Sequence, residues 1–285
     1  AVAQDRAAEK AHFTRCGVAC APYAVIETAA QLAAVGDELL PGIVKTTRMG
    51  YDGKGQIRVK TREELAAAWQ QLRQVPCVLE KMLPLAAEIS VIVARGRDGQ
   101  MVNLPPQLNV HRDGILAVTE VHAQAMPAQR QALAVESTRS IAQGLGYVGV
   151  LCVEYFVLAD GSLVVNEMAP RPHNSGHYSM DACDVSQFEL QVRAMTGLPL
   201  VQPRQHSAAI MLNLLGDLWF RQGDQAQTPP WAQVLALPGT HLHLYGKAEA
   251  RRGRKMGHLN VTGADAQAVR ATALQAAALL GIEAF

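Results

Sequence analysis

The sequence has few aromatic residues and no block of like charge, and both shortages limit the kind of partner we expect. Phe, Trp and Tyr together make up 5% of the 285 residues, too few for the aromatic platforms on which nucleic-acid bases stack. The 26 basic and 25 acidic residues leave a formal net charge of +1. The sequence therefore does not predict a nucleic-acid footprint.

A cysteine framework and a long apolar run are also absent. The five cysteines are Cys16, Cys20, Cys77, Cys152 and Cys183. Their number is odd, and no second pair completes a zinc site with Cys16 and Cys20, so we expect reduced thiols in a cytoplasmic protein.

The longest apolar stretch, 141–158, contains three glycines and Glu154 and is not predicted to span a membrane. The first ten residues are charged and lack the apolar core of a signal peptide.

The predicted helices and strands alternate in an order typical of an α+β protein with hairpins. Helices are predicted at residues 6–15, 28–35, 61–73, 127–144, 186–197 and 265–280. Strands are predicted at 23–26, 42–45, 56–60, 77–80, 88–93, 149–158, 163–167, 208–214, 241–245 and 258–261. The polar segment 221–230 ends in two prolines and is predicted to be a loop or linker.

A glycine-rich loop, RMGYDGKGQ at 48–56, joins two of these predicted strands. It does not match a P-loop, because Gly55 is followed by Gln56 rather than by Lys and Ser or Thr. Nor is it a dinucleotide fingerprint, because a strand follows it and not a helix.

Such a loop can still bind phosphates, because its glycines expose backbone N–H groups and adopt positive φ. Lys54 in the loop and Lys45 in the strand before it would add positive charge. The alternative is an ordinary hairpin turn, since Asp52–Gly53 is a common turn dipeptide.

Two glutamates indicate a metal site. Asp160–Gly161 is typical of a two-residue hairpin turn, and that turn would place Glu154 directly opposite Glu167. Like charges in such a pair destabilise a sheet, so we expect a magnesium ion to compensate, with Asn166 as a further oxygen donor nearby. The alternative is a solvent-facing pair of acids beside lysines.

The segment after the second glutamate, EMAPRPHNSGH at 167–177, is dense in polar groups. Its two prolines stiffen the backbone and make a helical histidine–metal site unlikely, so the segment favours an anionic or polar ligand. The cluster RRGRKMGH at 251–258 could hold a phosphate, or could be a solvated turn. Together these residues indicate metal-assisted phosphoryl transfer that depends on positioning and charge neutralisation.

Four motifs occur in an order that resembles the N5-carboxyaminoimidazole ribonucleotide synthases. These are ATP-grasp enzymes of bacterial and fungal purine synthesis. The motifs are IVKTTRMGYDGKGQ, the pair Glu154 and Glu167, NEMAPRPHNSGH, and GRKMGHLN, and the resemblance extends from about residue 5 to residue 262. It implies an α+β, ATP-grasp fold of two lobes that clasp ATP, with a small β-rich C-terminal subdomain. The expected divisions are 1–27 (a linker helix and the remnant of an N-terminal domain), 28–84 (the lid), 85–200 (the core) and 201–285 (the C-terminal subdomain).

The family reaction consumes ATP, bicarbonate and 5-aminoimidazole ribonucleotide through carboxyphosphate, with ATP and Mg²⁺ as cofactors. The resemblance further implies a homodimer. It implies ATP contacts at Arg6, Lys45, Gly50, Tyr51, Asp52, Gly53, Lys54, Gly55, Gln56, Glu80, Lys81, Glu88, His111, Asn166 and Glu167. It implies metal ligands at Glu154 and Glu167. Substrate contacts are implied at Arg171, His173, Asn174, Ser175, Gly176, Arg254 and Lys255, and catalytic roles at Asp52, Arg254 and Lys255.

The chain departs from the family pattern in two ways. Leu108 stands where the family usually has Glu, and the N-terminal domain that usually precedes this region is expected to be missing. Two alternatives therefore stay open. One is a different ATP-grasp ligase of purine precursors, such as the formate-dependent glycinamide ribonucleotide transformylase, against which the YDGKGQ loop argues. The other is an ATP-binding module without full activity.

Overall fold

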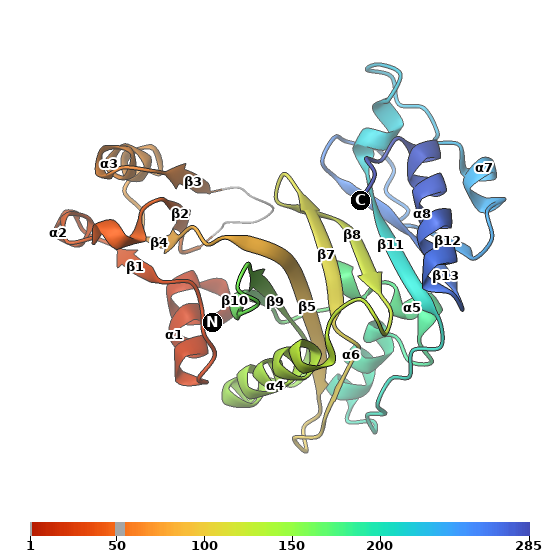
Figure 1. The fold of residues 1–285 in the computed structure, drawn as a ribbon, viewed down its shortest axis with the longest axis horizontal. Coiled ribbons are helices and arrows are strands. Elements are labelled where there is room, and N and C mark those ends of the chain that lie inside the picture. The colour runs from red at the N-terminus through yellow and green to blue at the C-terminus, as the bar shows by residue number, and fades with distance from the viewer. Residues whose placement is uncertain (1, 49–54) are drawn as a thin grey trace.

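The computed structural model describes residues 2–48 and 55–285, which form a small sheet and a large sheet (Figure 1). The strands of the small sheet are β1 (Tyr23–Ile26), β4 (Cys77–Lys81), β2 (Gly42–Thr46) and β3 (Gln56–Val59), in that order and all antiparallel. Helices α2 (Ala29–Ala33) and α3 (Arg62–Gln71) complete this lobe. Its core is built from side chains such as Ile26, Leu65 and Trp69. β1 lies before the expected lid boundary at residue 28 and nevertheless belongs to this sheet.

The large sheet has nine strands in the order β10-β9-β5-β7-β8-β11-β13-β12, with β6 paired to β5. The first part consists of β5 (Leu85–Arg95), β6 (Met101–Asn103), β7 (Gln107–Arg112), β8 (Ile115–Val121), β9 (Gly149–Leu158) and β10 (Leu163–Ala169). The C-terminal part consists of β11 (Ala208–Leu215), β12 (Thr240–Leu244) and β13 (Lys255–Gly263). Because β8 pairs with β11, the C-terminal part continues the same sheet.

Helices cover both faces of β5 and β9. On one face α1 (Arg6–Arg15) and α4 (Ala128–Leu145) pack against residues such as Val91 and Val153. On the other face α5 (Ser179–Ala182) and α6 (Gln187–Thr196) pack against residues such as Ile92 and Cys152. Successive residues of a strand point to opposite faces, which explains why both strands read as continuous apolar runs.

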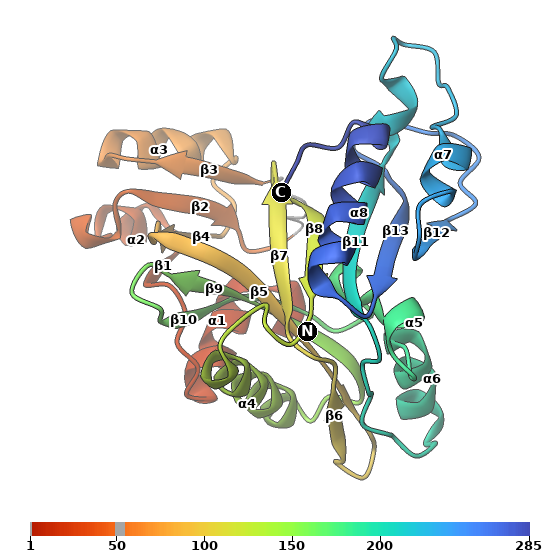
Figure 2. The ribbon, with the colours of Figure 1, turned by 45° about the vertical axis from the view of Figure 1, so that its right-hand side comes forward.

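The C-terminal strands carry a third apolar core beneath α7 (Trp231–Leu235) and α8 (Ala266–Leu280). Figure 2 shows α8, β11 and β13 on one side of the molecule and the lobe with α2 and α3 on the other. None of the described helices is long and apolar enough to cross a membrane.

The α+β class is confirmed, and so is the irregular structure of segment 221–230. Three strands that the sequence did not predict, β6, β7 and β8, lie between residues 101 and 121. They matter because β7 and β8 join the two parts of the large sheet and carry His111 to the cleft described below. How the chain divides into subdomains remains a proposal.

Candidate functional site

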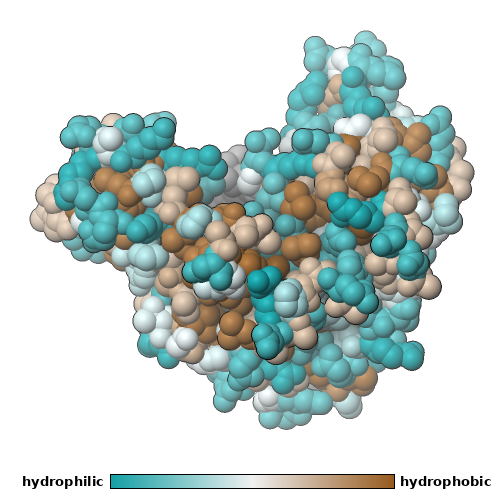
Figure 3. All heavy atoms as spheres, in the orientation of Figure 1, coloured by the Kyte–Doolittle hydropathy of each residue, from teal (hydrophilic) through white to brown (hydrophobic). Residues whose placement is uncertain are grey.

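A cleft of about 1120 Å³ is lined by residues of both lobes. Its walls come from α1, β2 and β3 on one side and from β5, the β7–β8 hairpin, β9, β10 and the start of β13 on the other. Figure 3 shows the two lobes standing apart on one face of the molecule. Polar side chains dominate the lining, and they include two arginines and two histidines of the predicted site, Arg6, Arg171, His111 and His173.

Glu154 and Glu167 face each other across β9 and β10, as the sequence predicted. The predicted two-residue turn is wrong, however. The Leu158 N–H donates to the Ser162 carbonyl, and Gly161 has φ +85°. The strand pairs nearest the turn are therefore shifted by one residue from the predicted register. A bulge at Asn166 then restores the pairing of the two glutamates, and Asn166 itself lines the cleft.

Glu167 and Glu154 each lie beside a basic side chain from another segment. Arg6 Nη1 is 3.2 Å from Glu167 Oε2, and His173 Nε2 is 3.1 Å from Glu154 Oε1. Burial alone would raise the pKa of Glu154, but the hydrogen bond from His173 and nearby positive charges hold it below its usual value. Glu154 is therefore ionised at neutral pH.

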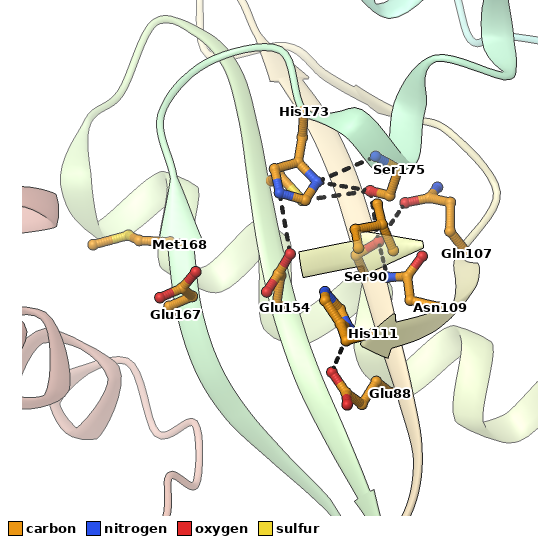
Figure 4. A network of polar contacts seen from close by, with 12 residues as sticks. Glu88, Ser90, Gln107, Asn109, His111, Glu154, Glu167, Met168, His173 and Ser175 are labelled. Atoms are coloured by element: carbon orange, nitrogen blue, oxygen red, sulfur yellow. Dashed lines mark hydrogen bonds and ion pairs between the residues drawn. The ribbon is translucent and has the colours of Figure 1, made fainter. Parts of the chain in front are cut away.

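A third pair joins β5 to β7. His111 Nδ1 is 2.6 Å from Glu88 Oε2, and this contact raises the pKa of His111 although burial opposes the charge. Figure 4 shows the contact of His111 with Glu88 and the contact of His173 with Glu154 on neighbouring strands. Glu167, Glu154 and Glu88 are thus each held by a basic side chain of the protein itself.

A buried triad of charges lies where the two lobes meet. Glu80 Oε2 is 3.1 Å from Lys45 Nζ and 3.2 Å from Lys10 Nζ, and all three side chains are almost fully buried. Burial lowers the pKa of Lys45, and the Glu80 carboxylate opposes this shift. Two cations share one anion, so the triad has an excess positive charge, which suits the phosphates of a nucleotide.

Helix α1 joins these groups. The Asp5 carboxylate caps its first turn by accepting N–H groups of Ala7 and Ala8. Arg6 and Lys10 then reach Glu167 and Glu80, while Glu9 accepts the Met168 N–H at 2.7 Å. One helix therefore contacts both the small lobe and the strand that carries Glu167.

Most of the predicted site residues that the structure describes line this one cleft. They are Arg6, Lys45, Gln56, Glu88, His111, Glu154, Asn166, Glu167, Arg171, His173, Asn174 and Lys255. The predicted residues Gly50, Tyr51, Asp52, Gly53 and Lys54 lie outside the described part of the chain.

The structure differs from the prediction at several positions. Ser175 and Gly176 are buried away from the cleft, and a Cβ on Gly176 would lie 2.4 Å from Ile92 Cδ1. The Arg254 side chain is exposed and donates to the Glu249 carbonyl. Gly55, Glu80 and Lys81 also do not line the cleft; Glu80 contacts it only through Lys45.

Other polar residues of the site were missed. Lys10 and Glu9 fall at i+4 and i+3 from Arg6, a helical spacing that could have revealed a common buried face with Phe13. Ser90 and Asn109 gave no such signal, because their contact depends on the register of β5 against the unpredicted β7.

The donor set of the cleft fits magnesium. Among the residues that the structure describes, no group of three or more His, Cys, Asp or Glu side chains could hold a metal by itself. Mg²⁺, however, is usually bound by one or two carboxylates together with the phosphates of a nucleotide. Glu154 and Glu167, with the amide oxygen of Asn166 nearby, supply hard oxygen donors of this kind.

Comparisons with known proteins agree with this geometry. The ATP-grasp domain model matches residues 11–188, and the phosphoribosylaminoimidazole carboxylase C-terminal domain model matches residues 209–272. N5-carboxyaminoimidazole ribonucleotide synthase of Brucella melitensis is 42% identical over 90% of this chain and 69% of its own length. The Escherichia coli synthase is 40% identical over 94% of this chain and 71% of its own.

Solved structures extend the likeness to the fold. The ADP complex of the Staphylococcus aureus synthetase has a TM-score of 0.85 and 36% identity over 98% of this chain and 72% of its own. The synthase of Aspergillus clavatus, in complex with ADP and 5-aminoimidazole ribonucleotide, has a TM-score of 0.86 and 28% identity over 98% of this chain and 74% of its own.

The pKa of Glu9 gives a testable dependence of stability on pH. Burial raises this pKa from its ordinary 4.5 to about 8, and the negative charge of Glu167 adds to the rise, although the Met168 N–H opposes it. Between these two values the folded protein holds a proton that the unfolded chain has released. The Glu9 carboxyl therefore lowers stability as the pH rises from 4.5 to about 8.

Glu9→Gln should remove this loss while keeping an oxygen that accepts the Met168 N–H. We expect the variant to gain stability over the parent protein at about pH 8 relative to about pH 5, as measured by urea unfolding. Glu136→Gln, at an exposed position of α4, is the control and should show no such gain. An equal gain at both pH values would mean that Glu9 is ionised in the fold.

Proposed function

The chain belongs to the N5-carboxyaminoimidazole ribonucleotide synthase family of ATP-grasp proteins, and from this premise we propose that it carboxylates 5-aminoimidazole ribonucleotide. The reaction uses ATP and bicarbonate and forms N5-carboxyaminoimidazole ribonucleotide, ADP and phosphate. The observation that carries the proposal is the facing pair Glu154 and Glu167, set in a cleft with Arg6 and Lys45.

The reaction has two bond-forming steps. A bicarbonate oxygen attacks the γ-phosphorus of ATP, which gives carboxyphosphate and releases ADP. The exocyclic amine of the aminoimidazole then attacks the carboxyl carbon, phosphate leaves, and the amine loses a proton. Neither step needs a protein nucleophile, so catalysis rests on orientation and on neutralising charge.

The residues of the cleft divide into a nucleotide side and a substrate side. Lys45 and Arg6 attract the phosphates, and Glu88, held by His111, accepts the ribose hydroxyls. Glu154, Glu167 and Asn166 would hold Mg²⁺, which would supply positive charge to the phosphate oxygens. We further propose that the glycine loop Gly50 to Gln56, most of which lies outside the described residues, binds the triphosphate, and that Glu80 and Lys81 bind the adenine.

The substrate side consists of residues from the loop after β10 and from β13. Arg171, Asn174 and Lys255 bind bicarbonate and the ribonucleotide, and Arg254, the neighbour of Lys255 in the chain, is a candidate for a further contact. Asp52 is the candidate for proton transfer from the amine. Ser175 and Gly176 act here only by shaping the loop, because they are buried.

We propose that ligand binding changes the partners of the charged side chains in the cleft. Arg6, which contacts Glu167 in the free protein, would bind a phosphate instead, and the Glu167 carboxylate would then be available to hold a divalent cation. Because nucleotide phosphates and a divalent cation would give Arg6 and Glu167 new partners of opposite charge, we expect metal and nucleotide to bind better together than either alone.

The decisive experiment measures ADP release with Mg²⁺, with and without bicarbonate and with and without 5-aminoimidazole ribonucleotide. We expect release to require bicarbonate and to rise when the ribonucleotide is added, because that substrate consumes carboxyphosphate. The proposal would be contradicted by an equal rate of ADP release with and without the ribonucleotide, or by ATP binding without any ADP release.

Loss of one metal carboxylate should slow the reaction strongly. Glu167→Gln keeps the shape of the side chain but removes the charge that neutralises Mg²⁺, so we expect kcat to fall by about 100-fold or more. Glu189→Gln is the control, because it also breaks a single contact with an arginine, Arg193, but on α6 outside the cleft. Similar activity of the two variants in steady-state assays would exclude the assigned role.

We also propose that the protein is a cytoplasmic homodimer. All five cysteines are free thiols, as a reducing compartment favours. Helix α6 exposes an apolar row of Phe188, Val192 and Met195 at i, i+4 and i+7, and such a row on a surface helix favours contact with a second copy.

Light scattering tests the dimer. We expect a dimeric mass for the parent protein and a monomeric mass for Val192→Asp, which places a charge in the apolar row. Leu133→Asp, at an equally exposed leucine of α4, is the control and should remain dimeric. A monomeric parent protein at micromolar concentration would refute the proposal.

A further inference from the structure

A continuous row of buried hydrogen bonds leads from the interior of the large sheet to Glu154. Thr119 Oγ1 donates to Asn109 Oδ1 (3.0 Å), and Asn109 Nδ2 donates to Ser90 Oγ (2.9 Å). Ser90 Oγ lies 2.8 Å from Ser175 Oγ and 3.0 Å from Gln107 Oε1, and Ser175 Oγ lies 2.9 Å from His173 Nδ1. The row ends at the contact of His173 with Glu154, and Figure 4 shows most of its members in one view.

The row crosses four structural elements. Thr119 and Asn109 are opposite each other on β8 and β7, and Ser90 is opposite Glu154 on β5 and β9. Ser175 lies in the short 3₁₀ turn Asn174–Gly176 that packs over this face of the sheet. Groups from β8, β7, β5 and the turn therefore converge on one carboxylate of β9.

Burial makes the row costly unless it is complete. The side chains of Thr119, Ser90 and Ser175 are fully buried, and Asn109 is nearly so. A buried hydroxyl or amide without a partner costs about 1–3 kcal/mol, whereas apolar residues at these positions would pack without any such requirement. Stability alone therefore does not call for polar side chains here.

This row of hydrogen bonds fixes the orientation of the His173 imidazole. The Ser175 backbone N–H donates to Nδ1 at 3.4 Å, and the Ser175 hydroxyl lies against the same nitrogen. With Ser175 against Nδ1, the imidazole is held so that Nε2 lies 3.1 Å from Glu154 Oε1 and can donate to it. This contact uses one carboxylate oxygen and directs the other away from the imidazole.

We propose that Ser90, Ser175 and His173 are positioning residues that hold Glu154 in the orientation needed to bind a divalent cation together with a nucleotide. The inference rests on the proposed function, because it assigns Glu154 to the metal. His173, which the sequence assigned to the substrate, acts in this account through Glu154. Such outer partners of a metal ligand commonly change metal affinity by about 10–100-fold.

The test measures Mn²⁺ binding without turnover, by electron paramagnetic resonance in the presence of a non-hydrolysable ATP analogue. We expect Ser90→Ala and Ser175→Ala each to weaken Mn²⁺ binding by about 10-fold. Thr138→Val is the matched control: it also removes a buried hydroxyl, one that contacts Tyr155 and Ala134 on the other face of the sheet. It should leave Mn²⁺ binding within about twofold of the parent protein.

Two further variants separate the hydrogen bond from packing. Glutamine can present its side-chain N–H close to the place of the imidazole Nε2, so His173→Gln should bind Mn²⁺ more tightly than His173→Ala. In the ligand-free protein, ¹⁵N spectra of labelled histidine should show one fixed state of the His173 ring, and Ser175→Ala should change that signal while Thr138→Val should not.

Parent-like Mn²⁺ binding in both serine variants, or an equal loss in Thr138→Val, would overturn this inference and leave the proposed function standing. Failure of the parent protein itself to bind Mn²⁺ with the nucleotide would instead refute the assignment of Glu154 and Glu167 as metal ligands.

Discussion

The repulsion between Glu154 and Glu167 is the constraint on which the site depends. Two carboxylates paired across neighbouring strands destabilise a sheet, and here the bulge at Asn166 keeps them paired despite the shifted turn. The fold compensates from both sides, with Arg6 from α1 against one acid and His173 from the loop after β10 against the other. In the free protein, Arg6 and His173 thus balance the two carboxylates in the way that the positive charge of a ligand would.

Helix α1 extends the same electrostatic arrangement to the small lobe. Its Lys10 shares Glu80 with Lys45, so the junction of the lobes is a buried ion cluster. Removing Glu80 would leave two buried cations without a partner, a loss of about 3–5 kcal/mol. The position of Lys45 in the cleft and the attachment of the small lobe therefore rest on one carboxylate.

Sequence reasoning succeeded where local patterns decide the structure and failed where distant strands meet. Capping residues such as Thr61 and Ser186, and the apolar runs of β5 and β9, gave most elements within a few residues. The pairing of Glu154 with Glu167 was predicted correctly, but from a wrong turn. The bulge at Asn166 was missed, because strand periodicity does not reveal a bulge. β7 and β8 were missed, and with them the contact of Ser90 with Asn109.

The most direct test of this account is a crystal structure with Mn²⁺ and ADP, in which anomalous scattering locates the metal. We expect a peak between the carboxylates of Glu154 and Glu167, with Arg6 turned from Glu167 to the nucleotide phosphates. A peak elsewhere in the cleft, or bound ADP with Arg6 still on Glu167 and no metal between the acids, would contradict it.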